Sequence, residues 1–185
     1  MKTLANKIKK ELLKKGATHV IIATKENASD QIKFSNNRIS IATNWSSSDL
    51  SIFIAVKNKL ASTSLKQFDK KTISSTVNNL IKIAKLSKQN KDFIDIAKGP
   101  FKYKEIKDTY DKRIAQINKV KIVEDSISEA IKNNANRTSG ILESSTMSIL
   151  LTTSSDVEAQ AKATSIHLSI RALKNKFASG HLTST

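Results

Sequence analysis

Apolar residues recur along this chain at two different spacings, and the change from one to the other separates expected helices from expected strands. Leu4, Ile8 and Leu12 stand four residues apart with lysines between them, and Gly16 follows. This spacing is typical of an amphipathic helix that ends at a left-handed glycine. We expect the helix to pack against a sheet, because it lacks the aromatic residues that anchor a helix at a membrane surface.

From Ala17 onward, apolar and polar residues alternate in short runs. Alternation of this kind predicts strands, here over residues 18–24, 31–34, 38–41, 50–56 and 60–64. The pair Asn36-Asn37 predicts a two-residue hairpin turn, because asparagine tolerates positive φ. Lys57-Asn58-Lys59 separates the last two strands. The first part of the chain therefore reads as a helix followed by an antiparallel meander.

Two further helices are expected on either side of an irregular stretch. Asp69 can cap a helix that runs through Ser87 and carries its apolar residues on one face. Residues 88–118 hold the only proline and no clear period, so we expect a packed crossing connection there. Helical spacing resumes near Val120, with Val123, Ile127, Ala130 and Ile131 on one face, and ends at residues 133–136.

Strand patterns return after this helix, with Met147, Ile149 and Leu151 on one predicted face and alternation again over residues 166–172. The string at residues 172–179 matches the string at 55–62 in six of eight positions. A duplication and the chance convergence of two Lys- and Asn-rich hairpins both explain this match. The predicted fold is α+β, with antiparallel meander sheets and helices packed on one face. Its sub-halves are about 1–87 and 119–185, each a helix plus a meander, joined by 88–118.

The chain carries 32 Lys and Arg against 16 Asp and Glu, a formal net charge of +16. Such a surplus attracts nucleic-acid phosphates or an anionic membrane surface. However, only four of these cations are arginine, and the lysines are spread evenly through every segment. A solvated basic surface is therefore favoured over a nucleic-acid site, which stays open as the alternative.

The absence of cysteine excludes disulfides, Cys-ligated metal sites and thiol nucleophiles. Neither a secretory signal nor a run of apolar residues long enough for a membrane span occurs, so we expect a cytoplasmic protein. His19 and His167 alternate with apolar residues on predicted strands, and His181 is expected in a tail. None of the three histidines has the spacing of a metal pair.

Carboxylates and serines give no clearer chemistry. Glu124, Asp125 and Glu129 lie on or near one predicted helix, where a solvated face with nearby lysines is favoured over a paired acid and base. No Gly-x-Ser-x-Gly motif exposes a serine nucleophile. From its residues alone, the sequence therefore predicts no catalytic, metal or cofactor-binding residue.

Three strings nevertheless resemble a known family in their order along the chain. They are the residues from Ile32 to Ile39, the triplet Thr109-Tyr110-Asp111, and the stretch from Thr138-Ser139-Gly140 to Arg171 with Ser179-Gly180. Together they resemble the amino-terminal domain of the TldD/PmbA family of zinc metallopeptidases, also known as modulators of DNA gyrase. The likeness covers residues 1–185. The chain departs from the family's glycines at Ser48-Asp49-Leu50 and from its Asp-Gly turn at Lys57-Asn58-Lys59.

The resemblance implies a role without a catalytic residue. The family holds zinc with a His-Glu-x-x-x-His motif on a helix beyond the matched region, so no catalytic, metal or cofactor-binding residue carries over to this chain. The expected partners are a homologous TldD/PmbA-type subunit or a carboxy-terminal domain, and an extended peptide that the assembled dimer cleaves by proteolysis. The chain alone is expected to be inactive. One alternative is a basic nucleic-acid-binding or ribosome-associated module, and another is an autonomous enzyme that uses carboxylates. We expect no membrane partner.

Overall fold

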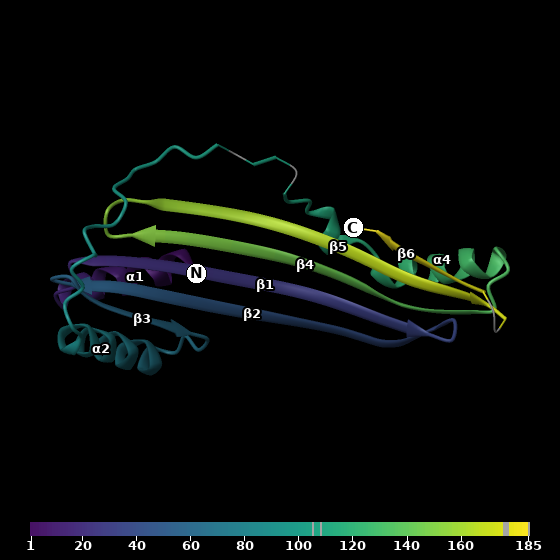
Figure 1. The fold of residues 1–185 in the computed structure, drawn as a ribbon, viewed down its shortest axis with the longest axis horizontal. Coiled ribbons are helices and arrows are strands. Elements are labelled where there is room, and N and C mark those ends of the chain that lie inside the picture. The colour runs from purple at the N-terminus through teal and green to yellow at the C-terminus, as the bar shows by residue number, and fades with distance from the viewer. Residues whose placement is uncertain (105, 108, 176–177, 185) are drawn as a thin grey trace. The chain divides into compact units, whose positions relative to one another are not determined.

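The computed structural model describes residues 1–104, 106–107, 109–175 and 178–184. Two similar series, each a helix followed by three strands, occur along the chain (Figure 1). The elements are α1 (Lys2–Lys14), β1 (His19–Ser35), β2 (Arg38–Val56), β3 (Lys59–Leu65), α2 (Lys70–Leu86), α3 (Arg113–Gln116), α4 (Lys119–Lys132), β4 (Arg137–Thr153), β5 (Glu158–Lys174) and β6 (Ala178–Ser184).

The strands form one antiparallel sheet of six strands in the order β3-β2-β1-β4-β5-β6. Each half of the chain supplies a helix, two long strands and a strand of seven residues, and the first strands of the two series are neighbours. The α+β meander predicted from the sequence is therefore confirmed. Whether the two series arose by duplication stays a prediction, and Lys176 and Phe177 of the repeated string lie outside the described residues.

The predicted turns form where asparagine accepts a left-handed backbone. Asn36 and Asn37 have φ of 50° and 62° and connect β1 to β2. Lys57 and Asn58 have φ of 49° and 62° and connect β2 to β3. Positive φ at both central residues matches the twist of the flanking strands, which is why such two-residue turns close hairpins.

The strands are longer than the sequence pattern predicts. The expected strands at 18–24 and 31–34 are parts of one strand, β1, and those at 38–41 and 50–56 are parts of β2. The residues that join them, such as Lys25, Glu26 and Ser47, carry no apolar alternation. Hydrogen bonding to neighbouring strands satisfies their backbone groups, so the strand continues without an apolar face of its own.

The chain divides into two compact units, and each long strand contributes residues to both of them. Unit 1 comprises residues 1–26, 47–106 and 148–161. Its core lies between the sheet and two amphipathic helices, with α2 contacting both β3 and α1. The buried residues of the helices are Ala5, Ile8 and Leu12 of α1 and Val77, Leu80, Ile81 and Ala84 of α2. Ile8, Leu12 and the apolar face of α2 are confirmed, whereas Leu4 of the predicted series is only partly buried and Ala5, outside that series, is buried instead.

The predicted start of α2 and the predicted end of α1 are both confirmed. The Asp69 side chain accepts a hydrogen bond from the Thr72 amide at 2.9 Å and so caps the start of α2. Gly16 follows α1 with φ of 99°, and the amides of Gly16 and Ala17 bond to the carbonyls of Leu13 and Leu12. A left-handed glycine at this point satisfies carbonyls that the end of a helix leaves free.

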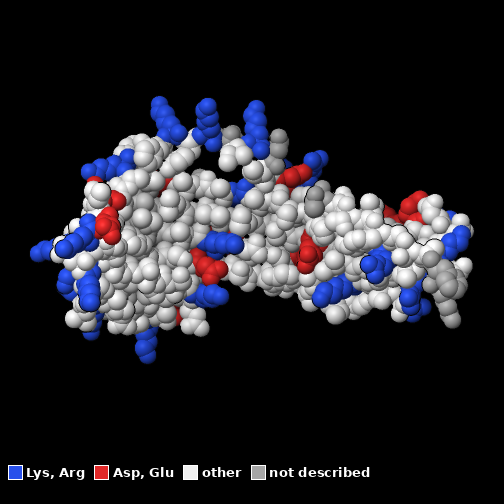
Figure 2. Space-filling view, viewed as in Figure 1, with Lys and Arg blue, Asp and Glu red and all other residues white. Residues whose placement is uncertain are grey.

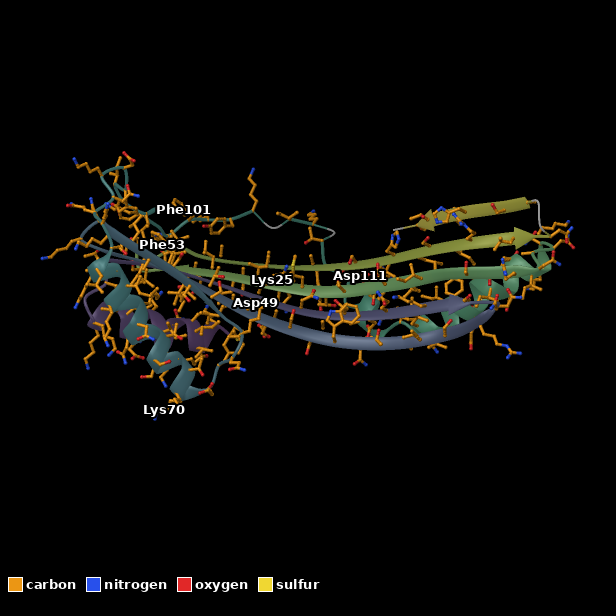
Figure 3. All side chains as sticks on the ribbon, turned by 60° about the horizontal axis from the view of Figure 1, so that its bottom comes forward. Lys25, Asp49, Phe53, Lys70, Phe101 and Asp111 are labelled. Atoms are coloured by element: carbon orange, nitrogen blue, oxygen red, sulfur yellow. The ribbon has the colours of Figure 1, made fainter. Side chains whose placement is uncertain are left out.

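The face of unit 1 opposite the helices carries different contacts. Phe53, labelled in Figure 3, lies on this face and its ring centroid is 6.0 Å from that of Phe93. The connection that begins at Lys88 is irregular, as predicted, apart from the short α3. It is not closely packed, because Ile94, Phe101 and Tyr103 are exposed. The expectation of a packed connection is therefore wrong for these residues.

Unit 2 comprises residues 27–46, 107–147 and 162–185, of which 108, 176–177 and 185 are not described. Val123 and Ile127 of α4 pack on Ile32 and Phe34 of β1 and on Leu142 of β4. Gly140 lies beneath the Phe34 ring, where an added Cβ would stand 2.4 Å from Phe34 Cζ and 2.1 Å from the Ser169 carbonyl oxygen. The close packing at this point therefore requires glycine.

One predicted strand face is wrong. The alternation in the sequence predicts Met147, Ile149 and Leu151 on one apolar face of their strand, but the buried leucines of β4 are Leu142 and Leu150. The run Ile149-Leu150-Leu151 places apolar residues on both faces of the strand, so alternation could not choose between the two faces.

Among the described residues, no helix combines the length and the apolar composition that crossing a membrane requires.

Candidate functional site

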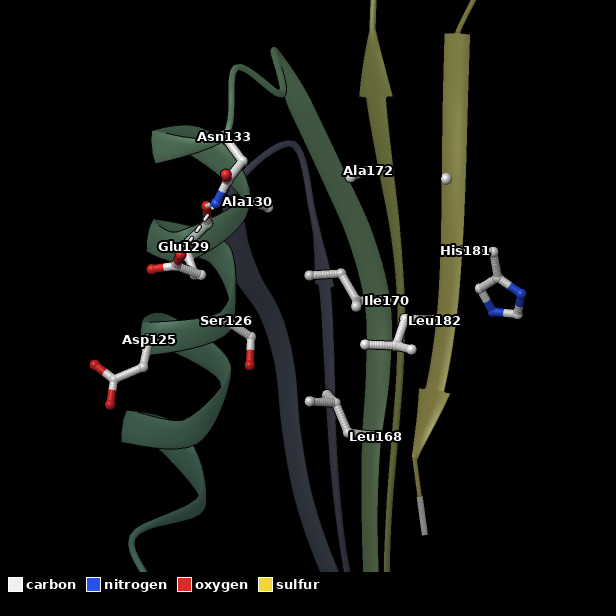
Figure 4. A pocket seen from close by; sticks show the side chains of 11 residues that line it. Asp125, Ser126, Glu129, Ala130, Asn133, Leu168, Ile170, Ala172, His181 and Leu182 are labelled. Carbon is white, nitrogen blue, oxygen red and sulfur yellow. Dashed lines mark hydrogen bonds between the residues drawn. The ribbon is translucent and has the colours of Figure 1, made fainter.

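An open groove of about 700 Å³ lies beside α4 in unit 2. Strands β5 and β6 line its other side (Figure 4). Its apolar lining consists of Ala130, Leu168, Ile170, Ala172 and Leu182. Leu168, Ile170 and Leu182 point toward the helix. Leu168 and Ile170 are partly buried against the α4 core, whereas Leu182 is 66% exposed, so the described elements cover the apolar floor only in part.

The position of α4 explains why this floor stays open. Asn118 caps the helix by accepting a hydrogen bond from the Lys121 amide at 3.0 Å. The Lys119 ammonium, nearly buried, lies 2.9 Å from an Asp30 carboxylate oxygen on β1. With its start fixed there, α4 buries Val123 and Ile127 on β1 and β4 and presents its next face to the groove.

The rim of the groove on the α4 side is acidic. Asp125 and Glu129 are exposed and line the groove. The Asp125 carboxylate lies 3.1 Å from the Lys121 ammonium, and the Glu129 carboxylate lies 3.7 Å from the Lys132 ammonium. This is the solvated face with nearby lysines that the sequence predicts. Glu124 is exposed on the same helix and does not line the groove.

His181 does not lie in a tail, which corrects the sequence-based expectation. It belongs to β6, opposite Arg171 of β5. Its Nε2 atom is 2.8 Å from the Ser169 hydroxyl oxygen, and its ring points away from α4 (Figure 4). The sequence did contain a signal for this strand. Residues 172–179 repeat residues 55–62 at an offset of 117, and the end of β3 at Leu65 corresponds by that offset to residue 182.

The other two histidines lie on strands, as predicted. His19 on β1 approaches the Asp95 carboxylate at 3.0 Å, and its ring meets the edge of Phe93. The pKa of Asp95 is lowered mainly by a hydrogen bond from the Lys98 side chain, then by the Ile96 amide, and less by His19. His167 is half-buried on β5. Within the described part of the chain, no three His, Cys, Asp or Glu side chains are grouped so that they could hold a metal ion.

The strings that resemble the TldD/PmbA family contact one another in unit 2. The Asn37 carboxamide oxygen accepts hydrogen bonds from the Thr138 amide at 2.7 Å and the Thr138 hydroxyl at 3.0 Å. The Asn37 side chain also donates to the Asn136 carbonyl, and the Asn136 side chain accepts from the Asn175 amide. These bonds connect the β1-β2 turn, the start of β4 and the β5-β6 turn.

The string Thr109-Tyr110-Asp111 runs beside β5. The Thr109 carbonyl accepts a hydrogen bond from the Thr164 amide at 2.9 Å, and the Asp111 amide donates to the Thr164 hydroxyl at 2.8 Å. The Arg113 guanidinium, 2.7 Å from Asp111, lowers the pKa of that carboxyl. Asp108, next to this string, lies outside the described residues. Residues 109–111 thus lie against the part of β5 that β6 does not reach.

The edge strand β6 is the second feature of this site. All seven of its residues are exposed, including Leu182 at 66%, and none is lysine, arginine, aspartate, glutamate or proline. A strand of this kind presents unpaired backbone N–H and C=O groups on its outer side. Chemically, the site offers hydrogen bonds to an extended chain at the edge and apolar contact in the groove.

Comparison with solved structures shows which fold this is. TldE from Thermococcus kodakarensis matches 98% of this chain with a TM-score of 0.76 and 15% identity. A candidate modulator of DNA gyrase from Bacteroides thetaiotaomicron matches 99% with a TM-score of 0.77 and 15% identity. A second candidate modulator of DNA gyrase, from Thermotoga maritima, matches 98% with a TM-score of 0.78 and 13% identity.

The chain spans 42% to 43% of the length of these three structures. No protein-family model matches the sequence. No curated protein matches it in sequence either. The resemblance noted in the sequence is therefore confirmed at the level of the fold, which is the fold of part of TldE and of the two gyrase-modulator structures.

Proposed function

We propose that this chain is the non-catalytic, amino-terminal part of a TldD/PmbA-type zinc metallopeptidase and acts together with a metal-bearing subunit or domain. The observation that carries the proposal is the match of 98% or more of the chain to a minor part of each solved structure. In the family that the sequence resembles, the zinc motif lies outside this part. The chain then contributes framework and contacts, and the zinc ligands come from its partner.

Within that role, the edge strand β6 binds an extended peptide. An unfolded peptide that adds to a sheet edge gains backbone hydrogen bonds whatever its sequence, which suits the recognition of extended substrates. The absence of lysine, arginine, aspartate, glutamate and proline from β6 supports this reading, because protein edges are commonly protected by those residues. Seven residues allow a peptide segment of similar length to pair.

A binding measurement with a neutral, unstructured, fluorescently labelled peptide tests the role of β6. Ser179→Lys/Thr183→Lys places two charged side chains on the face of β6 away from the groove. Charged side chains on an edge strand disfavour the addition of another strand, so this variant should bind roughly tenfold more weakly. The matched control Asn78→Lys/Asn79→Lys adds the same charge to the exposed face of α2 and should bind as the unmodified chain does. Equal affinity for both double variants would refute peptide addition at β6.

An activity measurement tests the absence of catalysis. The purified chain, supplied with Zn²⁺, should not hydrolyse unfolded casein, whereas a mixture with a metal-bearing TldD-type subunit should hydrolyse it. Hydrolysis by the chain alone that a chelator abolishes would contradict the proposal. Chelator-resistant hydrolysis that is lost on substitution of a carboxylate would instead support an autonomous enzyme.

The basic module remains the competing function, and the net charge of +16 favours it. On the face visible in Figure 2, lysine and arginine are scattered, with carboxylates among them. Nucleic-acid binding through phosphates predicts an affinity that falls log-linearly with salt, by about one unit of slope per phosphate neutralised. We expect weak binding of a duplex or single-stranded oligonucleotide, with no dependence on the residues of β6.

A further inference from the structure

The two helix-plus-meander series differ at one place. In unit 1, β3 is followed by α2, which begins at Lys70 and contacts both β3 and α1. As a result, Ala61 and Leu65 of β3 are buried. In unit 2, α4 and β6 take the places of α1 and β3 in the order of elements. Within the described residues, no helix lies beside β6 as α2 lies beside β3, and the groove occupies that side of the strand.

The lining of the groove has the chemistry of a helix-binding surface. Leu168, Ile170 and Ala172 alternate along β5, and Leu182 extends the apolar strip onto β6. An amphipathic helix covers such a strip with residues at i, i+3, i+4 and i+7. In unit 1 the matching strip is covered by Val77, Leu80, Ile81 and Ala84, which have this spacing.

The charged residues that line the groove indicate which side chains a bound helix should carry on its polar face. Asp125 and Glu129, one helical turn apart on α4, line the groove, and no lysine or arginine of the described residues lines it. Each carboxylate is paired with a lysine of α4 that lies outside the groove, Lys121 and Lys132 respectively, and both pairs are exposed to solvent. In a chain with twice as many cationic as anionic residues, this rim is acidic against the general charge. It therefore complements a helix with lysine or arginine on the flank that faces α4.

We propose that the groove between α4 and β6 is the seat of an amphipathic, basic-flanked helix supplied by a partner polypeptide. The helix lies beside α4 and over β5 and β6 as α2 lies beside α1 and over β3. At the length of α2, it comprises about four to five turns. This inference does not depend on the proposed peptidase role, because it rests on the groove and on the comparison of the two units.

The probe for the test is a synthetic peptide with the sequence of residues 69–87 of this chain, which contains an apolar helical face and flanking lysines. A scrambled peptide of the same composition is its control. Binding to the full chain is followed by fluorescence anisotropy, and helix formation is followed by circular dichroism. The expected result is saturable binding with a gain of helix for the peptide and none for the scrambled sequence.

Three variants of the chain locate the binding. Leu182→Lys, at an exposed position, should weaken binding at least roughly fivefold, whereas Leu86→Lys, at an exposed position of α2, should not change it. Asp125→Lys/Glu129→Lys should weaken binding of the basic peptide and restore tight binding of a peptide whose lysines are replaced by glutamates. Glu124→Lys, outside the groove, is the control for a single acid-to-lysine reversal on α4, and Asp125→Lys alone is compared with it.

Four results would overturn the proposal. The first is equal binding of the scrambled peptide, and the second is equal affinity of Leu182→Lys and the unmodified chain. The third is binding without any gain of helix, which would assign the surface to an extended strand. The fourth is a dimer of the chain, in sedimentation, that Leu182→Lys disrupts, because the groove would then be filled by a second copy. Loss of peptide binding at β6 alone leaves this inference standing and contradicts only the proposed function.

Discussion

The two outer strands of the sheet, β3 and β6, have equal length and equivalent places in the chain, but their surroundings differ. α2 covers one face of β3, and Gln89 forms a bridge with Lys59 at the start of its outer edge. Every residue of β6 is exposed. Two strands of equal length therefore have different surroundings: β3 completes a core, whereas the outer backbone groups of β6 and part of the apolar surface of the adjoining groove stay exposed.

The largest expected effect comes from removing a side chain on the covered side. Leu80 of α2 is 1% exposed in the core of unit 1, and Leu80→Ala should lower the free energy of unfolding by about 2–5 kcal/mol. The control is Leu182→Ala on the open side, where we expect a change within about 0.5 kcal/mol. Chemical denaturation measures both. A similar cost for the two variants would show that the groove is already filled in the isolated chain.

A smaller effect is expected from overfilling unit 2. The Cβ of Gly140→Ala would meet Phe34 Cζ and the Ser169 carbonyl, so this substitution should cost about 1–3 kcal/mol. Gly180→Ala on β6 has nothing within 4 Å of the added Cβ and should be tolerated. Thermal unfolding distinguishes the two variants. Equal midpoints would contradict the close packing of β4 beneath Phe34 and the open space around β6.

The turns next to β6 depend on a single carboxamide. Asn37→Gly keeps a positive φ available but removes the bonds to Thr138, so it should lower stability by about 1–3 kcal/mol. Asn36→Gly has the same backbone effect and serves as the control. Denaturation of both variants measures the difference between them. If the two variants unfold together, the side chain of Asn37 does not stabilise this end of unit 2.

The smallest expected effect concerns the helix that covers β3. The Thr72 hydroxyl and amide lower the pKa of Asp69 below its ordinary 3.8, so ionised Asp69 stabilises the folded state. A lowered pKa in the folded state means that this stability is present above pH 3.8 and is lost as the pH falls through the folded value. Asp69→Ala should lower the unfolding midpoint at pH 7 and have less effect at acidic pH.

Asp69→Asn keeps an acceptor for the Thr72 amide and removes the titration, so its unfolding midpoint should vary less with pH. Thermal unfolding of all three proteins between pH 2 and pH 7 measures the effect. A midpoint difference between Asp69→Ala and the unmodified chain that stays constant over this range would exclude ionised Asp69 as the source of stability.

The elements that the sequence predicts best are those whose signal is local. Asp69, Gly16 and the pairs Asn36-Asn37 and Lys57-Asn58 mark helix ends and turns through their own backbone preferences, and the structure uses each of them in that way. The apolar faces of α1 and α2 follow from their spacing for the same reason.

The features that the sequence could not predict depend on neighbours distant in the chain. The middle of β1 and β2 has no apolar alternation, and partner strands hold it in place. The apolar run at residues 149–151 fits either face of β4, and the choice of Leu150 is made by the core of unit 1. The sequence pattern places β6 in a tail because its residues are mostly polar or small. Only the repeat of residues 55–62 at 172–179 indicates a strand there.

Hydrogen exchange of the backbone amides, measured on the chain alone and with a metal-bearing TldD-type subunit, compares β3 and β6 residue by residue. In the chain alone, we expect amides of β6 to exchange much faster than those of β3. We expect the added subunit to protect β6 and residues 125–133 of α4 and to leave β3 unchanged. Protection of β6 equal to that of β3 in the isolated chain, or protection by the subunit that is confined to β3, would contradict these expectations.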